Sequence, residues 1–419
     1  MNLLKTYLQN FSNRAGSYVF LSTAMGRLLS FLASWIALQL IPNTDLGIVL
    51  FAYHIVAFIL PFAGLGLHQS LLRYGALLES IEQKNNLFNY VLKKGLLISL
   101  VMTVLVATIS FVVPFQFPDT AYYLAALSAI LIPSFLLEII KIQFRLQHKN
   151  KDFSLVEICF TAILVVSVFV LSSFFKAPGY VAALIIAPTL TAVLFLKKLH
   201  LHRTLKTPVT GIKIDFWKYG FYAGLTNVVT NLLFIIDILL VGYLLNDASM
   251  VTAYKYVSII PISLLFLPRV FIATDYVSFT KNIYNKPYIF QYIKSYMLLF
   301  TLISGLFCGF SYVFSTEILG LFDPEFTRYS TSFFILIIGV SGILIFRGLF
   351  GNLLSSIGEI KVNSYIITAA LVLNTIGNYY LIPKYGIRGA AITSAVLMWF
   401  TGLLSCGCFL FLYSKMDDR

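Results

Sequence analysis

The sequence predicts an all-α polytopic membrane protein with about twelve transmembrane helices. Two features carry this prediction. The chain of 419 residues is 59% hydrophobic and only 11% charged, whereas a soluble domain carries about 25% charged residues. Its apolar runs, such as residues 96–113, are continuous and do not alternate with polar residues. Backbone groups inside a bilayer have no water to bind, so continuous apolar runs of this kind must form helices.

Each transmembrane helix needs roughly 17–25 apolar residues. This criterion places the predicted helices at residues 16–41, 46–76, 88–113, 121–147, 154–174, 179–199, 217–245, 249–277, 291–314, 330–354, 361–382 and 387–413. An even number of spans puts both termini on the same side of the membrane. The connections are short, which leaves no room for a catalytic domain outside the bilayer.

The distribution of lysine and arginine predicts the orientation. With the N-terminus in the cytoplasm, 22 of the 30 basic residues fall on the inner side, and only Lys176, Arg328, Lys384 and Arg388 fall on the outer side. Basic residues concentrate in cytoplasmic loops, so both termini are predicted to be cytoplasmic. The net charge of +13 is therefore a topology signal that also favours anionic membrane lipids, and we expect no nucleic-acid partner.

The longest and most basic connection, residues 197–218, divides the chain into two halves of six helices. We therefore predict one lobe at residues 1–206 and a second at residues 207–419. Both halves begin with an acidic residue in an outer turn, followed by a tyrosine and then a proline: Asp45, Tyr53 and Pro61 in the first half, and Asp247, Tyr254 and Pro261 in the second. Parallel repeats of this kind leave a cavity between two lobes.

No motif indicates an enzyme. The sequence has no Walker A motif and no group of His, Cys and carboxylate residues at metal-ligand spacing, and its four cysteines lie within apolar segments. We therefore expect no catalytic residue, no cofactor and no metal site.

Two segments resemble a known family. Residues 62–74, FAGLGLHQSLLRY, are similar to the glycine-rich stretch followed by arginine in polysaccharide-lipid flippases. Residues 373–391, LNTIGNYYLIPKYGIRGAA, resemble a signature of the same group, the Wzx-type polysaccharide-transport branch of the multidrug/oligosaccharidyl-lipid/polysaccharide (MOP) superfamily. The second segment also has a structural explanation, in which Pro383 ends one helix while Gly386 and Gly389 allow a tight turn and close packing.

The resemblance implies a MOP/MATE-like V shape of two six-helix lobes in the bacterial cytoplasmic (inner) membrane. It further implies a flippase that moves an undecaprenyl-diphosphate-linked oligosaccharide, such as an O-antigen or capsule repeat unit, to the outer leaflet by alternating access. The partners that it implies are the lipid-linked oligosaccharide, membrane lipids, a polysaccharide polymerase and chain-length proteins.

Four basic residues lie within predicted spans: Arg27, Lys255, Arg269 and Arg347. A charge within the bilayer is costly and normally faces a water-filled cavity or a partner. Arg27 lies eleven residues into the first span, roughly 16 Å deep at about 1.5 Å per residue, where it cannot easily reach the surface. We predict that these four residues bind the cargo, because arginine holds phosphate with two parallel hydrogen bonds. A structural ion pair for Arg27, and extension of the side chain to the membrane surface for Arg269, Arg347 and especially Lys255, remain open as alternatives.

Asp237 is the acidic residue that the sequence places well inside a span of the second half. Ion coupling and a structural pairing with one of the arginines both remain open for it. Glu138 and Lys141, three residues apart on one helix face, predict a local ion pair.

Two other functions remain as alternatives. A MATE-like, ion-coupled exporter of drugs or metabolites should show a cavity centred on acidic residues for cationic cargo, whereas this sequence has more basic than acidic residues within its spans. An integral membrane glycosyltransferase or polymerase usually carries a large outer loop, whereas the first outer loop here is residues 42–45.

Overall fold

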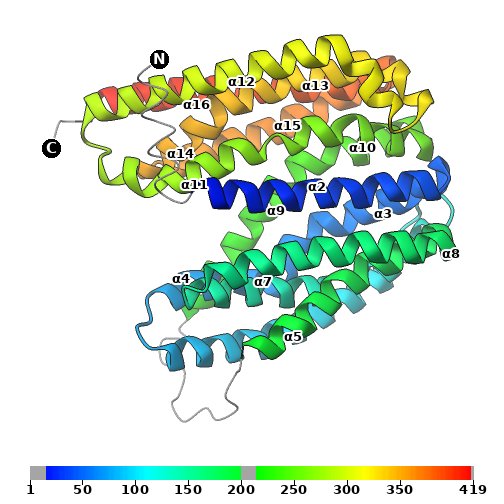
Figure 1. Cartoon of the computed structure of the whole chain (residues 1–419), viewed down its shortest axis with the longest axis horizontal. Coiled ribbons are helices and arrows are strands. Elements are labelled where there is room, and N and C mark those ends of the chain that lie inside the picture. The colour runs from blue at the N-terminus through cyan, green and yellow to red at the C-terminus, as the bar shows by residue number, and fades with distance from the viewer. Residues whose placement is uncertain (1–15, 200–213, 417–419) are drawn as a thin grey trace. The chain divides into compact units, whose positions relative to one another are not determined.

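The described chain is helical throughout, which confirms the predicted fold class (Figure 1). The computed structural model describes residues 16–199 and 214–416. In this part the elements are α2 (Gly16–Leu40), α3 (Asn43–Ile59), η1 (Leu60–Gly66), α4 (Leu67–Ala76), α5 (Ile81–Ser110), α6 (Thr120–Ser128), α7 (Leu131–Leu146), α8 (Asn150–Lys198), α9 (Ile214–Leu245), α10 (Ala248–Ser263), α11 (Phe266–Lys281), α12 (Lys286–Gly320), η2 (Pro324–Tyr329), α13 (Ser330–Gly342), η3 (Ile343–Arg347), α14 (Gly348–Ser356), α15 (Ile360–Tyr385) and α16 (Ile387–Ser414).

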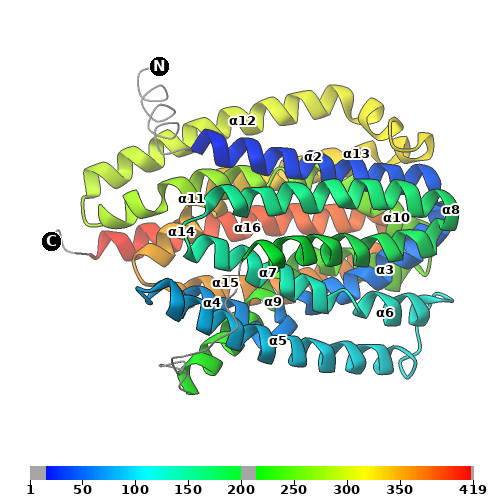
Figure 2. The same cartoon turned by 60° about the horizontal axis from the view of Figure 1, so that its bottom comes forward.

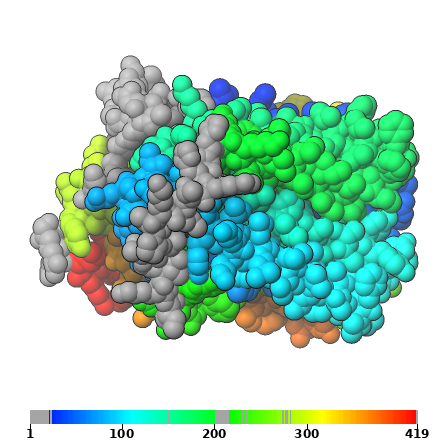
Figure 3. All heavy atoms as spheres, turned by 90° about the horizontal axis from the view of Figure 1, so that it is seen from below, coloured from blue at the N-terminus to red at the C-terminus, as the bar shows by residue number. Residues whose placement is uncertain are grey.

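Within the described residues, nine helical segments are long and apolar enough to cross a membrane, and α2 and α9 contribute shorter apolar stretches. Large apolar side chains are exposed along these segments, for example Val101 (57%) and Val104 (58%) on α5 and Phe169 (57%) on α8. Figure 3 shows the face of the molecule on which α5 and α8 lie. Exposure of this kind suits a surface that contacts lipid, because lipid tails impose no penalty on apolar groups.

The helix α8 supplies two of the predicted spans, because its chain reverses direction at Lys176, where φ is 51° and ψ is −128°. Lys198 Nζ lies 2.6 Å from Asp152 Oδ1. A straight helix would separate these residues by roughly 69 Å at about 1.5 Å per residue, so the ion pair shows that the two arms run antiparallel. Figure 2 shows both arms side by side.

The second predicted span is interrupted at η1. Gly64, Leu65 and Gly66 all have positive φ, from 51° to 68°, a left-handed conformation that glycine adopts without strain. The break brings the backbone of Gly66 against α9, where a Cβ on Gly66 would lie only 2.1 Å from the Gly220 carbonyl oxygen. Glycine is therefore required at this contact, which joins the second predicted span to the seventh.

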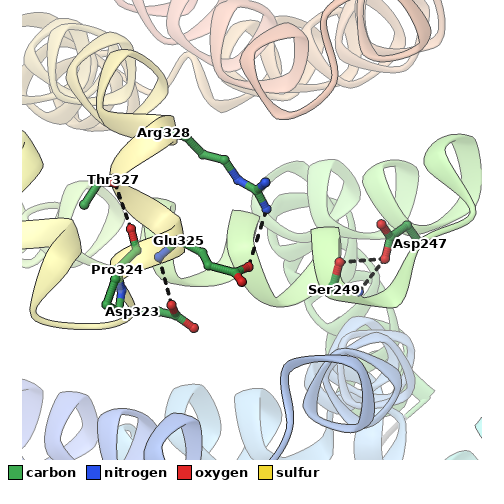
Figure 4. Close-up of polar contacts among 7 residues, drawn as sticks. All are labelled: Asp247, Ser249, Asp323, Pro324, Glu325, Thr327 and Arg328. Atoms are coloured by element: carbon green, nitrogen blue, oxygen red, sulfur yellow. Dashed lines mark hydrogen bonds and ion pairs between the residues drawn. The ribbon is translucent and has the colours of Figure 1, made fainter.

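Polar caps fix two of the connections at predicted outer turns (Figure 4). Before α10, Asp247 Oδ1 accepts hydrogen bonds from the Ser249 backbone N–H at 2.8 Å and the Ser249 hydroxyl at 2.7 Å. At η2, Asp323 Oδ1 accepts from the Glu325 backbone N–H at 2.9 Å. These caps satisfy backbone donors that the helix itself leaves unpaired.

The chain packs into two compact units. Unit 1 contains α2 up to Arg27, residues 243–245 and the chain from Ala253 onward; unit 2 contains residues 28–242 and 246–252. In unit 1, α16 packs along α13 and α15, and α12 packs along α13 (Figure 1). In unit 2, α7 packs against α5, α4 and α8. The predicted lobe boundary between residues 206 and 207 lies outside the described residues and stays a prediction.

Two turns, 210 residues apart and both predicted to face the cytoplasm, have the same geometry. The backbone N–H of Lys149 donates to the Phe144 carbonyl at 2.8 Å, and that of Glu359 donates to the Leu354 carbonyl at 2.9 Å. The residue before each donor, His148 or Gly358, has a positive φ. Residues near the ends of the two halves therefore correspond one to one.

The same offset relates two turns that are predicted to lie on the outer side. Gly386 between α15 and α16 has φ 58° and ψ −139°, close to the values at Lys176. Three residues after each turn, a Cβ on Gly179 would lie 2.0 Å from the Leu171 carbonyl oxygen, and a Cβ on Gly389 would lie 2.2 Å from that of Leu381. Both hairpins thus close by the same contact between a glycine and a backbone carbonyl.

One sequence prediction about this turn is wrong. Pro383 does not end the helix, because α15 continues to Tyr385 and the chain reverses at Gly386. The Gly386 backbone N–H still donates to the Ile382 carbonyl at 2.7 Å. Helix termination here therefore depends on the positive φ of Gly386 and not on the proline ring.

Candidate functional site: a basic cluster in unit 1

Three of the predicted cargo-binding residues come together in unit 1. Arg27 lies near the middle of α2, Lys255 in α10 and Arg269 in the first turn of α11. The positive charge of Arg27 repels both Lys255 and Arg269. Coulombic repulsion falls with distance, so the structure brings these three cations, from two regions far apart in sequence, into one basic cluster.

Two of the three cations lie on consecutive helices. Lys255 and Arg269 are fourteen residues apart, on α10 and α11. The helix is interrupted between them at Leu264 and Leu265, where bonds from their backbone N–H groups reach carbonyls three residues back.

The cluster lacks a counter-ion in the part of the chain that the structure describes. No carboxylate within ion-pair distance is found there for Arg27, Lys255 or Arg269, although Lys141, Lys198 and Arg328 all have one. Arg27 and Arg269 are exposed and Lys255 is half-buried. A charged side chain exposed to hydrocarbon is costly, so these groups suit a water-filled space or an anionic ligand.

Arg347 is held separately. It lies in the π-helical segment η3 of the tenth predicted span, and its Nη1 donates to Asn363 Oδ1 at 2.9 Å and to the Ser405 hydroxyl. The structure thus places three of the four predicted cations together and the fourth within the packing of η3, α15 and α16.

The predicted coupling residue, Asp237, is buried in α9 of unit 2, with 6% of its surface exposed. Sequence reasoning missed a second buried acid. Asp275 in α11 is 3% exposed, and its Oδ2 accepts a hydrogen bond from the Tyr292 hydroxyl at 3.2 Å. From the sequence alone, an aspartate close to the end of a predicted span cannot be told from a residue at the membrane surface. Its burial depends on tertiary packing, which the sequence pattern does not show.

The predicted ion pair of the first half is confirmed. Lys141 Nζ lies 2.6 Å from Glu138 Oε1 and 3.3 Å from Glu157 Oε2. The second carboxylate comes from the next span, on α8, which the spacing along one helix face does not reveal.

The described residues contain no group of three or more His, Cys, Asp or Glu that could hold a metal ion. The described cysteines are all free.

The fold and the apolar helices define a multi-pass α-helical membrane protein. The chain belongs to the polysaccharide biosynthesis protein family, whose family model matches residues 13–270. No curated protein matches the sequence significantly.

Solved structures share the fold. A multidrug resistance MATE family transporter of the MOP superfamily, in an inward-facing conformation, has a TM-score of 0.71 at 15% identity, covering 93% of this chain and 94% of that one. The lipid II flippase MurJ has a TM-score of 0.64 at 18% identity, covering 94% of each chain. A MOP superfamily transporter from Pyrococcus furiosus, described as having a binding pocket of reverse polarity, has a TM-score of 0.65 at 15% identity, covering 98% of this chain and 96% of that one. These matches establish the MOP fold.

Proposed function

We propose that the protein is a flippase for an undecaprenyl-diphosphate-linked oligosaccharide, such as an O-antigen or capsule repeat unit. It moves the lipid-linked sugar from the cytoplasmic to the outer leaflet of the bacterial inner membrane, with both termini in the cytoplasm. The observation that carries the proposal is the basic cluster of Arg27, Lys255 and Arg269. Membership of the polysaccharide biosynthesis family and a fold shared with a lipid II flippase support it.

The charge of the cluster selects the class of cargo. Arg27 repels both Lys255 and Arg269, none of the three has a described counter-ion, and such repulsion is stronger at low dielectric. A pyrophosphate supplies the missing negative charge and accepts paired hydrogen bonds from arginine. A cationic drug would add to the repulsion, so the cluster favours an anionic cargo over that of a MATE-like exporter, the second candidate that the shared fold suggests.

The arrangement suggests how the cargo moves. In an alternating-access cycle the basic cluster faces the cytoplasm and then the outside. The three cations would supply counter-charge to the pyrophosphate in both states. This transfer involves no covalent step, and a polysaccharide polymerase and chain-length proteins would act on the delivered product.

Arg27 provides the direct test, in a host whose own flippase is deleted. Arg27→Ala should lower surface polysaccharide at least about tenfold at normal protein level, because charge-assisted hydrogen bonds contribute about 1.5–3 kcal/mol each. Arg27→Lys should restore it only in part, since lysine lacks the paired donors. Surface glycan and the leaflet distribution of lipid-linked sugar are the measurements.

Arg328→Ala is the matched control, because Arg328 lies at an outer turn and is paired with Glu325 at 3.8 Å (Figure 4). It should complement fully. Full complementation by Arg27→Ala as well would contradict the assignment of Arg27 to the cargo.

Asp237 is proposed as a coupling residue on the basis of its burial within α9. Asp237→Asn should then lower transport while protein level and cargo binding stay near normal, and it should flatten the dependence of transport on external pH or sodium. Unchanged transport across those conditions would exclude coupling, and loss of the protein would instead indicate a structural role.

A further inference from the structure

The two parts of the chain that the 210-residue offset relates differ in how they neutralise a cation. The 210-residue offset relates Lys141 of α7 to Gly351 of α14. A Cβ on Gly351 would lie 3.5 Å from Cζ of Arg347. The guanidinium of Arg347 therefore lies over the position that corresponds to Lys141, and each half holds one cation there.

The carboxylates that neutralise the first cation have no counterpart in the second half. Glu138 and Glu157 both pair with Lys141, at 2.6 Å and 3.3 Å. The corresponding residues are Gly348 and Ile367. Arg347 thus keeps its charge while both acidic positions have become apolar, and the described residues supply no carboxylate to it.

The two described partners of Arg347 are neutral and held in place. The Asn363 amide donates to the Gly351 carbonyl at 2.6 Å and to the Ser355 hydroxyl at 3.1 Å, which directs its Oδ1 toward Arg347. The Ser405 hydroxyl donates to the Thr401 carbonyl at 2.7 Å and therefore accepts from Arg347. These two bonds orient the guanidinium without neutralising it.

The remaining donors of Arg347 are available. Both described hydrogen bonds come from Nη1; the Nε and Nη2 groups, which together form the edge that binds phosphate or carboxylate in paired fashion, have no acceptor among the described residues. Neither atom is among the fully buried polar atoms that lack a partner, and Arg347 as a whole is half-buried. The π-helical turn of η3 that places Arg347 here is a feature frequent at functional sites.

The depth of the group points to the ligand. Arg347 is nine residues from the end of α14 at Ser356, about 13 Å at about 1.5 Å per residue, and its side chain extends toward that end, over Gly351. The guanidinium therefore approaches the cytoplasmic boundary of the bilayer, where lipid phosphates lie.

We propose that Arg347, Asn363 and Ser405 form a lipid-phosphate site, separate from the basic cluster, that binds the phosphate or diphosphate headgroup of a lipid in the cytoplasmic leaflet. The ligand supplies the negative charge that Glu138 and Glu157 supply in the first half. This inference does not depend on the cargo proposed above, because a resident anionic phospholipid and an isoprenyl diphosphate offer the same phosphate chemistry.

The test uses the full chain in a zwitterionic detergent and follows its melting temperature against added lipid. Phosphatidylglycerol or geranylgeranyl diphosphate should raise the melting temperature of the wild type more than phosphatidylcholine does. Arg347→Gln, which keeps a hydrogen-bonding side chain without the charge, should lower the apparent affinity at least about tenfold, the effect of losing charge-assisted bonds of about 1.5–3 kcal/mol.

A second variant protects the test against simple misfolding. Ile367→Glu places a carboxylate at the position of Glu157 and should neutralise Arg347 internally, which removes the phosphate effect while the protein itself stays folded. Ile367→Gln is the neutral control of equal size and should keep the effect.

The two lipid probes distinguish the source of the phosphate. If geranylgeranyl diphosphate raises the melting temperature at a much lower concentration than phosphatidylglycerol does, the site belongs to an isoprenyl-linked lipid. If both lipids act at the same concentration, the site belongs to a resident phospholipid. A wild type that responds equally to phosphatidylcholine, or an Arg347→Gln variant with an unchanged response, would overturn the proposal.

Discussion

The hairpin of α8 and the hairpin of α15 and α16 solve the same problem with different residues. Both reverse the chain at nearly the same φ and ψ, and both place a glycine three residues later against a backbone carbonyl. The first hairpin, however, uses Lys176 at the turn where the second uses Gly386. The comparison teaches that the glycine–carbonyl contact is the shared requirement and that the turn residue is not.

The largest expected loss of stability comes from adding a methyl group at the glycine–carbonyl contact that the two hairpins share. Gly179→Ala and Gly389→Ala would each place a Cβ about 2 Å from a carbonyl oxygen, at 2.0 Å and 2.2 Å respectively, so the arms must separate. Overpacking of this kind costs about 1–3 kcal/mol. Both variants should melt at clearly lower temperature in detergent and reach the membrane in smaller amount.

Gly407→Ala is the control for these variants, because it lies on the same helix as Gly389 and a Cβ added there would have nothing within 4 Å. It should melt with the wild type. If Gly179→Ala and Gly389→Ala also do so, the hairpins do not depend on the close backbone contact.

A smaller change in melting temperature should distinguish the turn at Lys176 from the turn at Gly386. Lys176 has a positive φ with ψ −128°, a region that is nearly exclusive to glycine and costs other residues about 1–3 kcal/mol. Lys176→Gly should therefore raise the melting temperature, with part of the gain offset by the entropy of glycine in the unfolded chain. Gly386→Ala should lower it.

Lys176→Ala serves as the control, since it removes the charge and the long side chain but keeps the Cβ that causes the strain. It should leave the melting temperature unchanged. Stabilisation by Lys176→Ala equal to that by Lys176→Gly would mean that the lysine side chain, and not its backbone, is unfavourable there.

The helical class and the positions of the spans could be predicted from the sequence, because apolar length is a local property. The hairpin repeat could not, since Lys176 and Gly386 share a conformation but no chemistry. The beginnings of the halves suggested a repeat through residues such as Tyr53 and Tyr254, whereas the one-to-one correspondence is visible in backbone geometry near their ends.

The candidate site was predictable in part for a similar reason. Basic residues inside spans are conspicuous in a sequence, so Arg27, Lys255, Arg269 and Arg347 could be named. That three of them share one cluster depends on how α2 meets α10 and α11. The isolation of Arg347 and the burial of Asp275 likewise follow from tertiary packing, which spacing along one helix cannot reveal.

The tight reversal in α8 has a consequence for how the protein is made. Its two arms are joined by a turn without an intervening loop, and residues 174–179 include a single charge, that of Lys176. Delivering the turn to the far side of the membrane during synthesis therefore requires only one ammonium group to cross, at a transfer cost of a few kcal/mol. In the orientation that we propose, the Lys198–Asp152 pair at the open end of the hairpin stays on the side of the ribosome, so the two arms can enter the bilayer together.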